Sequence, residues 1–117
     1  MPRVLRCGLI QASNPKHEGS LQEIKEAMVQ KHLPLIEEAG KKGVQILCLQ
    51  EIFHGPYFPA EQDIKWYRTA EPVPGPLTER MAPIAKKHRM VMIVPVYEME
   101  QEGVYYNTAA VLDADGK

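Results

Sequence analysis

Residues 44–49 read V-Q-I-L-C-L, an almost continuous apolar run that has the length of one β-strand. A strand that is apolar on both faces is typical of a parallel sheet, in which other elements cover both sides. A Q-E pair follows the run directly, at the carboxyl end of the predicted strand. We therefore expect an α/β fold with this strand inside the sheet.

The segment before this strand predicts a β-α-β unit. Residues 4–12 read V-L-R-C-G-L-I-Q-A, which predicts a first strand that stops at the turn formers S-N-P. Residues 20–42 place apolar side chains mostly at helical spacing, with Ser20 as N-cap and Glu23 as the partner of a capping box. Pro34 lies inside this predicted helix, so we expect a kink near it. Strand, helix and strand in this order favour a right-handed crossover between parallel strands.

The segment after Glu51 predicts a long loop, a second helix and two more strands. The loop has about 25 residues and is rich in proline, and loops of this length in compact domains are commonly functional. Residues 78–88 predict a helix and residues 90–97 predict a third apolar strand. Residues 104–112 predict a fourth strand, which a polar turn joins to the third. We expect these last two strands to pair in antiparallel fashion.

The end of the sequence has the composition of a tight turn, D-A-D-G-K. A turn of this kind is useful where another strand follows it. With 117 residues, the chain has room for one core. We therefore expect residues 1–117 to be the front portion of one longer domain.

The charge balance and the apolar pattern argue against nucleic acid and membranes as partners. The chain has 14 basic and 15 acidic residues and a formal net charge of -1, so it has no electrostatic excess to hold phosphates or an anionic bilayer. The longest apolar stretch, residues 90–97, contains Pro95 and falls far short of the roughly 20 residues that cross a membrane. No signal-peptide pattern is found, so a cytoplasmic location is expected. Cys7 and Cys48 lie in apolar runs, and we expect both to be reduced and buried.

Glu51 is the candidate catalytic residue. It comes directly after the apolar run, and ligands of parallel α/β sheets bind at the carboxyl ends of the strands. A carboxylate in this position is expected to be partly desolvated, which suits a general base. The alternative is a glutamate that caps a helix or is simply hydrated.

Residues 47–59 read L-C-L-Q-E-I-F-H-G-P-Y-F-P. This string resembles the nitrilase superfamily of carbon-nitrogen hydrolases and, within it, the β-ureidopropionase and N-carbamoyl amidohydrolase branch. Other elements of the resemblance follow the same order along the chain: I-Q-A at 10–12, A-E at 70–71, P-G-P at 74–76 and Y-N-T-A-A at 106–110. The resemblance implies that residues 1–117 form the N-terminal half of a four-layer α-β-β-α sandwich.

The resemblance also implies a reaction. It is the hydrolysis of non-peptide carbon-nitrogen bonds by a cysteine hydrolase, with N-carbamoyl amino acids such as N-carbamoyl-β-alanine as the expected substrates. Glu51 matches the general-base glutamate of the family. The family's lysine and its nucleophilic cysteine lie further along than Lys117, so the 117 residues alone are expected to be inactive. No cofactor is implied, and a homo-oligomer is.

Cys48 does not match the nucleophile. It precedes Glu51 by three residues, so in a strand the two side chains point to opposite faces. The 4 histidines show no spacing typical of metal ligands. No metal site is expected.

Four other residues are candidates for contact with the small-molecule substrate. Phe53, His54 and Tyr57 follow Glu51 in the loop and are predicted to line a pocket for the acyl portion. The alternative for them is packing of the loop on the sheet. Asn107 is predicted to orient the Glu51 region through its amide, or else to satisfy backbone groups at a strand edge.

Three other interpretations compete with a carbamoyl amidohydrolase. A receiver-like signalling module needs clustered acids at its strand ends to hold a metal, whereas residues 11–14 read Q-A-S-N. A non-catalytic assembly partner made of this half agrees with the lack of a matching nucleophile, but it would leave a sheet face and a sheet edge open to water. An amidase or nitrilase of another substrate class is the third.

Overall fold

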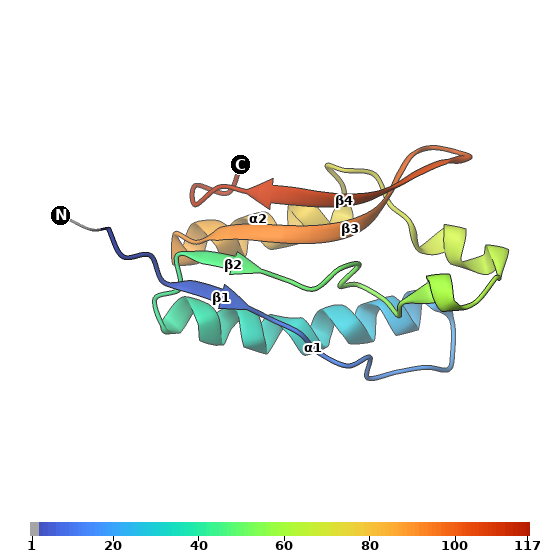
Figure 1. Ribbon diagram of the computed structural model, residues 1–117, viewed down its shortest axis with the longest axis horizontal. Coiled ribbons are helices and arrows are strands. Elements are labelled where there is room, and N and C mark those ends of the chain that lie inside the picture. The colour runs from blue at the N-terminus through green and yellow to red at the C-terminus, as the bar shows by residue number, and fades with distance from the viewer. Residues whose placement is uncertain (1–2) are drawn as a thin grey trace.

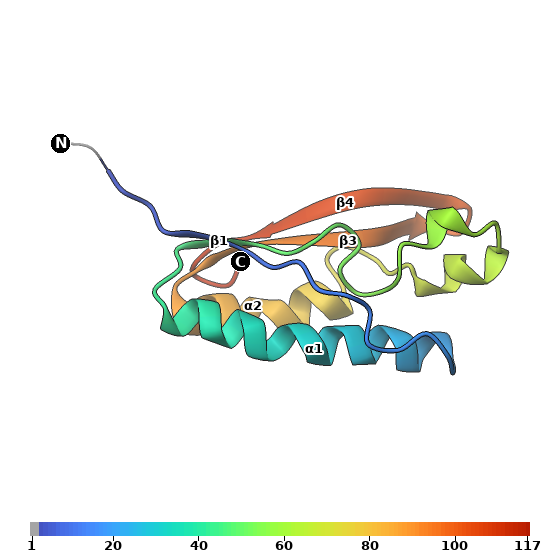
Figure 2. The same ribbon diagram turned by 60° about the horizontal axis from the view of Figure 1, so that its bottom comes forward.

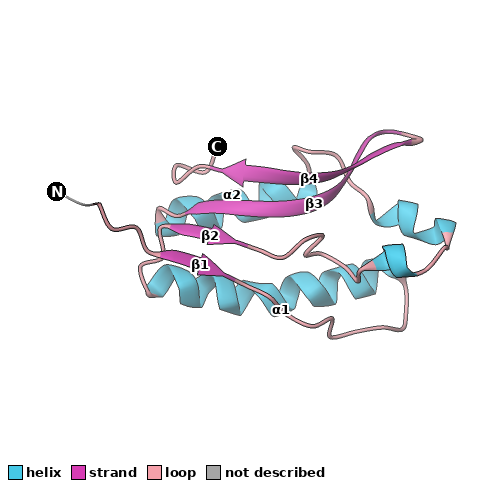
Figure 3. Cartoon of the chain, viewed as in Figure 1, coloured by secondary structure: helices cyan, strands magenta, loops and turns pink. Residues whose placement is uncertain are grey.

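The computed structural model describes residues 3–117, which form one mixed four-stranded sheet and two long helices. The strands lie in the sheet in chain order: β1 (Cys7–Leu9), β2 (Ile46–Cys48), β3 (Val91–Gln101) and β4 (Val104–Leu112) (Figure 1). β1, β2 and β3 are parallel, and β4 is antiparallel to β3. The helices are α1 (Leu21–Lys41) and α2 (Pro76–His88), and two short 3-10 helices, η1 (Phe58–Ala60) and η2 (Ile64–Thr69), lie in the long loop (Figure 3). The predicted α/β fold and the predicted hairpin are confirmed.

The first two strands are shorter than the sequence predicts. β1 and β2 pair only from Cys7 with Ile46 to Leu9 with Cys48. Beyond this short ladder a side chain replaces a backbone partner, because the Ala12 amide donates to Gln50 Oε1 at 2.5 Å. β3 is longer than predicted, since its pairing with β4 continues to Gln101.

Helix α1 begins with the predicted capping box. The Glu23 amide donates to Ser20 Oγ at 3.2 Å, and the Ser20 amide donates to Glu23 Oε2 at 2.8 Å. These two bonds satisfy backbone donors that the first turn of a helix leaves without partners. The helix continues without interruption through Pro34.

Both helices lie on the same face of the sheet, and they enclose the core there (Figure 2). Leu47, Met92 and Leu112 are register neighbours across three strands, and all three are buried. Met81 and Ala85 of α2 are fully buried members of the same apolar cluster. The alternation of side chains along each strand thus puts one set of apolar residues under the helices.

The other face of the sheet is open among the residues that the structure describes (Figure 2). Leu9 is 85% exposed and Val111 is 63% exposed. This placement corrects the expectation for the cysteines, because Cys7 is exposed and Cys48 is only partly buried. Both alternate with residues of the covered face, and no described helix lies over their own side of the sheet.

Candidate active site

Glu51 lies just past the carboxyl end of β2, where it meets a residue of β4. Asn107 Nδ2 donates to Glu51 Oε1 at 2.6 Å. Before Glu51, the Leu49 amide donates to the Ile93 carbonyl at 3.1 Å and continues the attachment to β3. The bond from Asn107 fixes one carboxylate oxygen, and no other residue between 3 and 117 is bonded to the second oxygen.

Glu51 is exposed, which corrects the expectation that this carboxylate is partly desolvated. The reason is its position. Asn107 pairs with Tyr97, next to the pair of buried Val96 with Thr108, so Asn107 belongs to the open face of the sheet. The carboxylate that it binds therefore lies on the side that α1 and α2 do not cover.

The backbone directly after Glu51 is strained. Ile52 has φ 46°, in the left-handed region that a β-branched residue rarely adopts. Such a conformation costs about 1–3 kcal/mol and persists where its surroundings enforce it. Here the next residue enforces it, because Phe53 is fully buried and its amide donates to the Pro95 carbonyl at 3.4 Å.

His54 is buried beneath the loop as a neutral ring. The Tyr97 amide donates to His54 Nε2 at 3.1 Å, so the proton of the imidazole is on Nδ1. Nδ1 has no hydrogen-bond partner among the described residues. Burial, and to a lesser extent the charge of Lys25, lowers the pKa of His54 to about 3.

The neutral His54 predicts that acid weakens the fold. Its pKa in the folded protein, about 3, lies below the ordinary value of 6.5, so the unfolded chain binds more protons in this window. The contribution of the neutral His54 to the free energy of unfolding is therefore fully present above pH 6.5. It is lost as the pH falls toward 3, by at most about 1.4 kcal/mol per pH unit.

We expect His54→Gln to show a shallower loss of stability than the wild type between pH 6.5 and pH 4.5. Glutamine takes up no proton in this range, and His32, whose pKa burial also lowers, is common to both proteins. Urea unfolding at a series of pH values measures the difference. Equal slopes for the two proteins would contradict the prediction.

The structure brings together only two of the five residues singled out in the sequence, Glu51 and Asn107. Phe53 and His54 are buried below the loop, and neither presents its side chain to solvent in residues 3–117. Tyr57 is 65% exposed, and it lines a separate cavity of about 210 Å³ with Asn14 and Trp66, among others.

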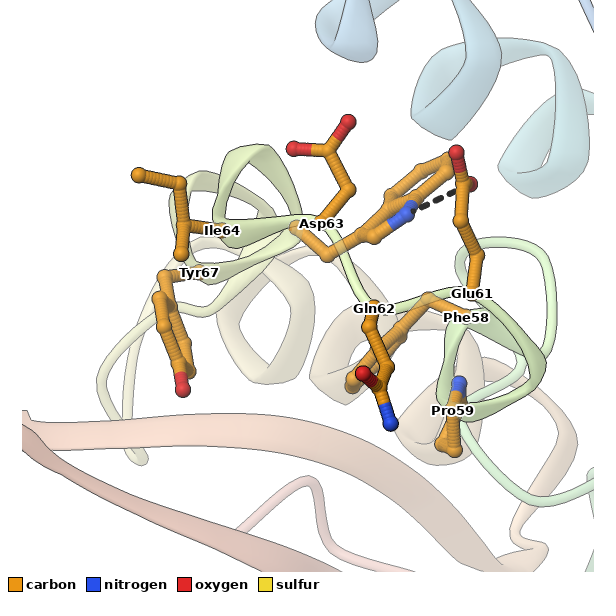
Figure 4. A pocket seen from close by; sticks show the side chains of 8 residues that line it. Phe58, Pro59, Glu61, Gln62, Asp63, Ile64 and Tyr67 are labelled. Atoms are coloured by element: carbon orange, nitrogen blue, oxygen red, sulfur yellow. Dashed lines mark hydrogen bonds between the residues drawn. The ribbon is translucent and has the colours of Figure 1, made fainter.

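A second cavity, of about 290 Å³, lies in the η1–η2 loop and was not foreseen from the sequence. Figure 4 shows the side chains that line it. They are those of Phe58, Pro59, Glu61, Gln62, Asp63, Ile64, Trp66 and Tyr67. Trp66 Nε1 donates to Glu61 Oε2 at 2.9 Å. The cavity does not include Glu51, and only the folding of the loop into two 3-10 helices creates it.

Sequence reasoning also missed a buried ion pair that attaches the long loop to the rest of the fold. Lys25 Nζ of α1 forms a salt bridge with Glu71 Oε2, and both side chains are largely buried. The other oxygen of Glu71 accepts a hydrogen bond of 2.6 Å from the Leu77 amide at the start of α2. The A-E pair at 70–71 was noticed only as part of a family resemblance, because no local pattern indicates a partner 46 residues away.

Two features are absent from residues 3–117, a cluster of metal ligands and a membrane-spanning helix. No group of three or more His, Cys, Asp and Glu side chains is placed to hold a metal ion. No helix in this range combines the length and the apolar character that a membrane span requires.

Comparisons with known proteins show which family the chain resembles. The sequence pattern that defines the family described as carbon-nitrogen hydrolase matches residues 7–117. A β-ureidopropionase from Arabidopsis thaliana is 36% identical over 118 residues, which cover 98% of this chain and 29% of that protein. An N-carbamoylputrescine amidase from Oryza sativa subsp. japonica is 40% identical over 83 residues, which cover 70% of this chain and 27% of that protein.

A solved structure shows the same fold. The crystal structure of a carbon-nitrogen hydrolase from Helicobacter pylori G27 superimposes with a TM-score of 0.74 at 22% sequence identity, over 97% of this chain and 37% of that one. The chain thus spans less than a third of the two curated relatives and little more than a third of this structure.

Proposed function

The chain belongs to the carbon-nitrogen hydrolase family, and from this premise we propose that it supplies the general base, Glu51, of an enzyme that hydrolyses non-peptide carbon-nitrogen bonds. N-carbamoyl amino acids, N-carbamoyl-β-alanine first among them, are the proposed substrates. The nucleophilic cysteine and a lysine that stabilises the tetrahedral intermediate are proposed to come from outside residues 1–117, and those residues alone are proposed to be inactive.

In the proposed mechanism, Glu51 takes the proton of the cysteine thiol as the sulfur attacks the carbonyl carbon of the substrate. The tetrahedral intermediate collapses when the carbon-nitrogen bond breaks and the protonated Glu51 gives its proton to the leaving nitrogen. Glu51 then takes a proton from water as the water attacks the carbonyl carbon of the thioester-like intermediate. When the carbon-sulfur bond breaks, Glu51 gives this proton to the sulfur, and the thiol is released. Every proton is returned, and no cofactor is used.

The observation that carries this proposal is the position of the Glu51 carboxylate. It lies at the carboxyl end of a parallel strand, where ligands of α/β sheets bind, and Asn107 holds one of its oxygens. A base must be held in place while its second oxygen stays free for proton transfer.

We propose that Asn107 and Tyr57 contact the substrate, because both are exposed. The burial of Phe53 and His54 favours the alternative role for this pair, which is packing of the loop beneath Glu51. Following the family resemblance, we also propose a homo-oligomer that acts in the cytoplasm. Gel filtration and cell fractionation test these two points.

The function is tested by assaying the complete gene product against four substrates: N-carbamoyl-β-alanine, N-carbamoylputrescine, a simple primary amide and a nitrile. We expect release of ammonia from N-carbamoyl-β-alanine, with complete loss of activity after alkylation by iodoacetamide. Preference for the amide or the nitrile would move the enzyme to another substrate class. Failure to hydrolyse any of the four would overturn the proposal.

A second candidate is a non-catalytic assembly partner. The open sheet face exposes Leu9 and Val111, and apolar surface of this kind needs a cover, which is either the second half of the proposed sandwich or a separate chain. An inactive gene product that forms a stable complex with a separate active chain would support this candidate instead.

A further inference from the structure

We propose that His54 is a positioning residue that holds Glu51 in its working geometry from the buried side of the sheet. The inference rests on the proposed function, because it assigns His54 a role in placing the proposed base. His54 itself touches neither Glu51 nor a substrate in this arrangement.

The edge of β3 extends past its neighbour β2. β2 ends at Cys48, so β3 continues beyond its neighbour and its edge needs other partners. The Pro95 carbonyl accepts from the Phe53 amide, and the Tyr97 amide donates to the imidazole Nε2 of His54 at 3.1 Å. A side chain of the loop thus takes the place of a strand partner at this edge.

The register of the β3–β4 hairpin connects Tyr97 with the residue that binds Glu51. Tyr97 is the register partner of Asn107 across β3 and β4, and Asn107 Nδ2 donates to Glu51 Oε1 at 2.6 Å. These contacts form a closed circuit of linked residues. The backbone connects Glu51 to His54, a hydrogen bond connects His54 to Tyr97, strand pairing connects Tyr97 to Asn107, and a second hydrogen bond connects Asn107 to the Glu51 carboxylate.

The backbone between Glu51 and His54 is strained. Ile52, with φ 46°, separates Glu51 from the buried Phe53 and His54. A strained turn relaxes when its anchors are removed. Without the His54 anchor, only the buried Phe53 and its amide bond to Pro95 still hold the turn. The turn should therefore move, and with it the carboxylate that the turn presents.

His32 provides a matched control. It is also fully buried, and its ring packs edge-on against Phe53 with centroids 5.2 Å apart. Its hydrogen bond, however, stays within its own helix, where His32 Nδ1 and the Met28 carbonyl oxygen are 2.8 Å apart. Substitution of His32 disturbs the same core without breaking the circuit to Glu51.

The experiment compares steady-state kinetics of the complete gene product and four variants, His54→Leu, His54→Gln, His54→Asn and His32→Leu. We expect kcat to fall roughly 100-fold in His54→Leu with KM nearly unchanged, since a misplaced catalytic group loses about this much. Glutamine carries an acceptor near the position of Nε2, so His54→Gln should retain kcat within about threefold. His32→Leu should lose stability and keep its kcat.

The inference is overturned if a folded His54→Leu enzyme keeps the wild-type kcat, if His54→Gln is as impaired as His54→Leu, or if His32→Leu loses as much kcat. If His54→Leu does not fold, His54→Asn takes its place, because the shorter amide does not reach the Tyr97 amide. Its folded form should show the same fall in kcat, and a wild-type kcat there also overturns the inference.

Failure of the inference is distinguishable from failure of the proposed function. An inactive wild type, or a Glu51→Gln variant that remains active, overturns the proposed function and the inference with it. A Glu51→Gln variant without activity, together with a fully active His54→Leu variant, overturns only the role of His54.

Discussion

Replacement of Glu51 by glutamine in the complete gene product should reduce turnover roughly 1,000-fold or more, because the variant loses the proposed base for both the cysteine and water. Glutamine has the same shape as glutamate, and its carbonyl oxygen still accepts the hydrogen bond that Asn107 donates to Oε1. Since the shape and this hydrogen bond are both kept, folding should be unaffected.

The measurement is kcat on N-carbamoyl-β-alanine beside far-ultraviolet circular dichroism. Glu102→Gln serves as the matched control, since Glu102 is an exposed glutamate in the β3–β4 turn, and it should keep full activity. A Glu51→Gln protein with more than about a tenth of the wild-type kcat would remove Glu51 from the chemistry.

Replacement of Glu71 by alanine should lower the free energy of unfolding by about 3–5 kcal/mol, the usual cost of breaking a buried ion pair from one side. Lys25 is left as a buried cation without its carboxylate, and the Leu77 amide loses its acceptor. Glu71 also pairs through its backbone with β3, to the Tyr97 carbonyl and the Met99 amide. Without the Glu71 side chain, the long loop that follows Glu51 should become more mobile.

Urea unfolding measures this effect, with Glu38→Ala as the control. Glu38 forms an exposed ion pair with Lys42, and exposed pairs of this kind contribute little to stability, so its loss should leave the unfolding curve unchanged. The double variant Lys25→Met with Glu71→Leu should be more stable than Glu71→Ala, since it leaves no buried charge. A loss below about 1 kcal/mol for Glu71→Ala would show that the pair is hydrated in solution.

The elements that the sequence predicted correctly depend on patterns between near neighbours. The capping box of Ser20 and Glu23 spans three residues, and the apolar run 44–49 marks a strand with a glutamate at its carboxyl end. Apolar periodicity also gave the order of the strands and helices. Periodicity reports which residues of an element avoid water, so it predicts elements and their order well but places their ends poorly.

By itself, then, the sequence determined the α/β class and the strand order along the chain, and it made Glu51 the candidate base. For Asn107 the sequence left two alternatives, and the tertiary structure decided for the contact with Glu51, 56 residues away. The contact of His54 with Tyr97, 43 residues away, came from the tertiary structure alone. It also exposed Cys7 and Glu51, against expectation. The physical reason is that such contacts depend on the register of paired strands and on which face the helices cover, and pairing between distant segments leaves no periodic pattern in the chain.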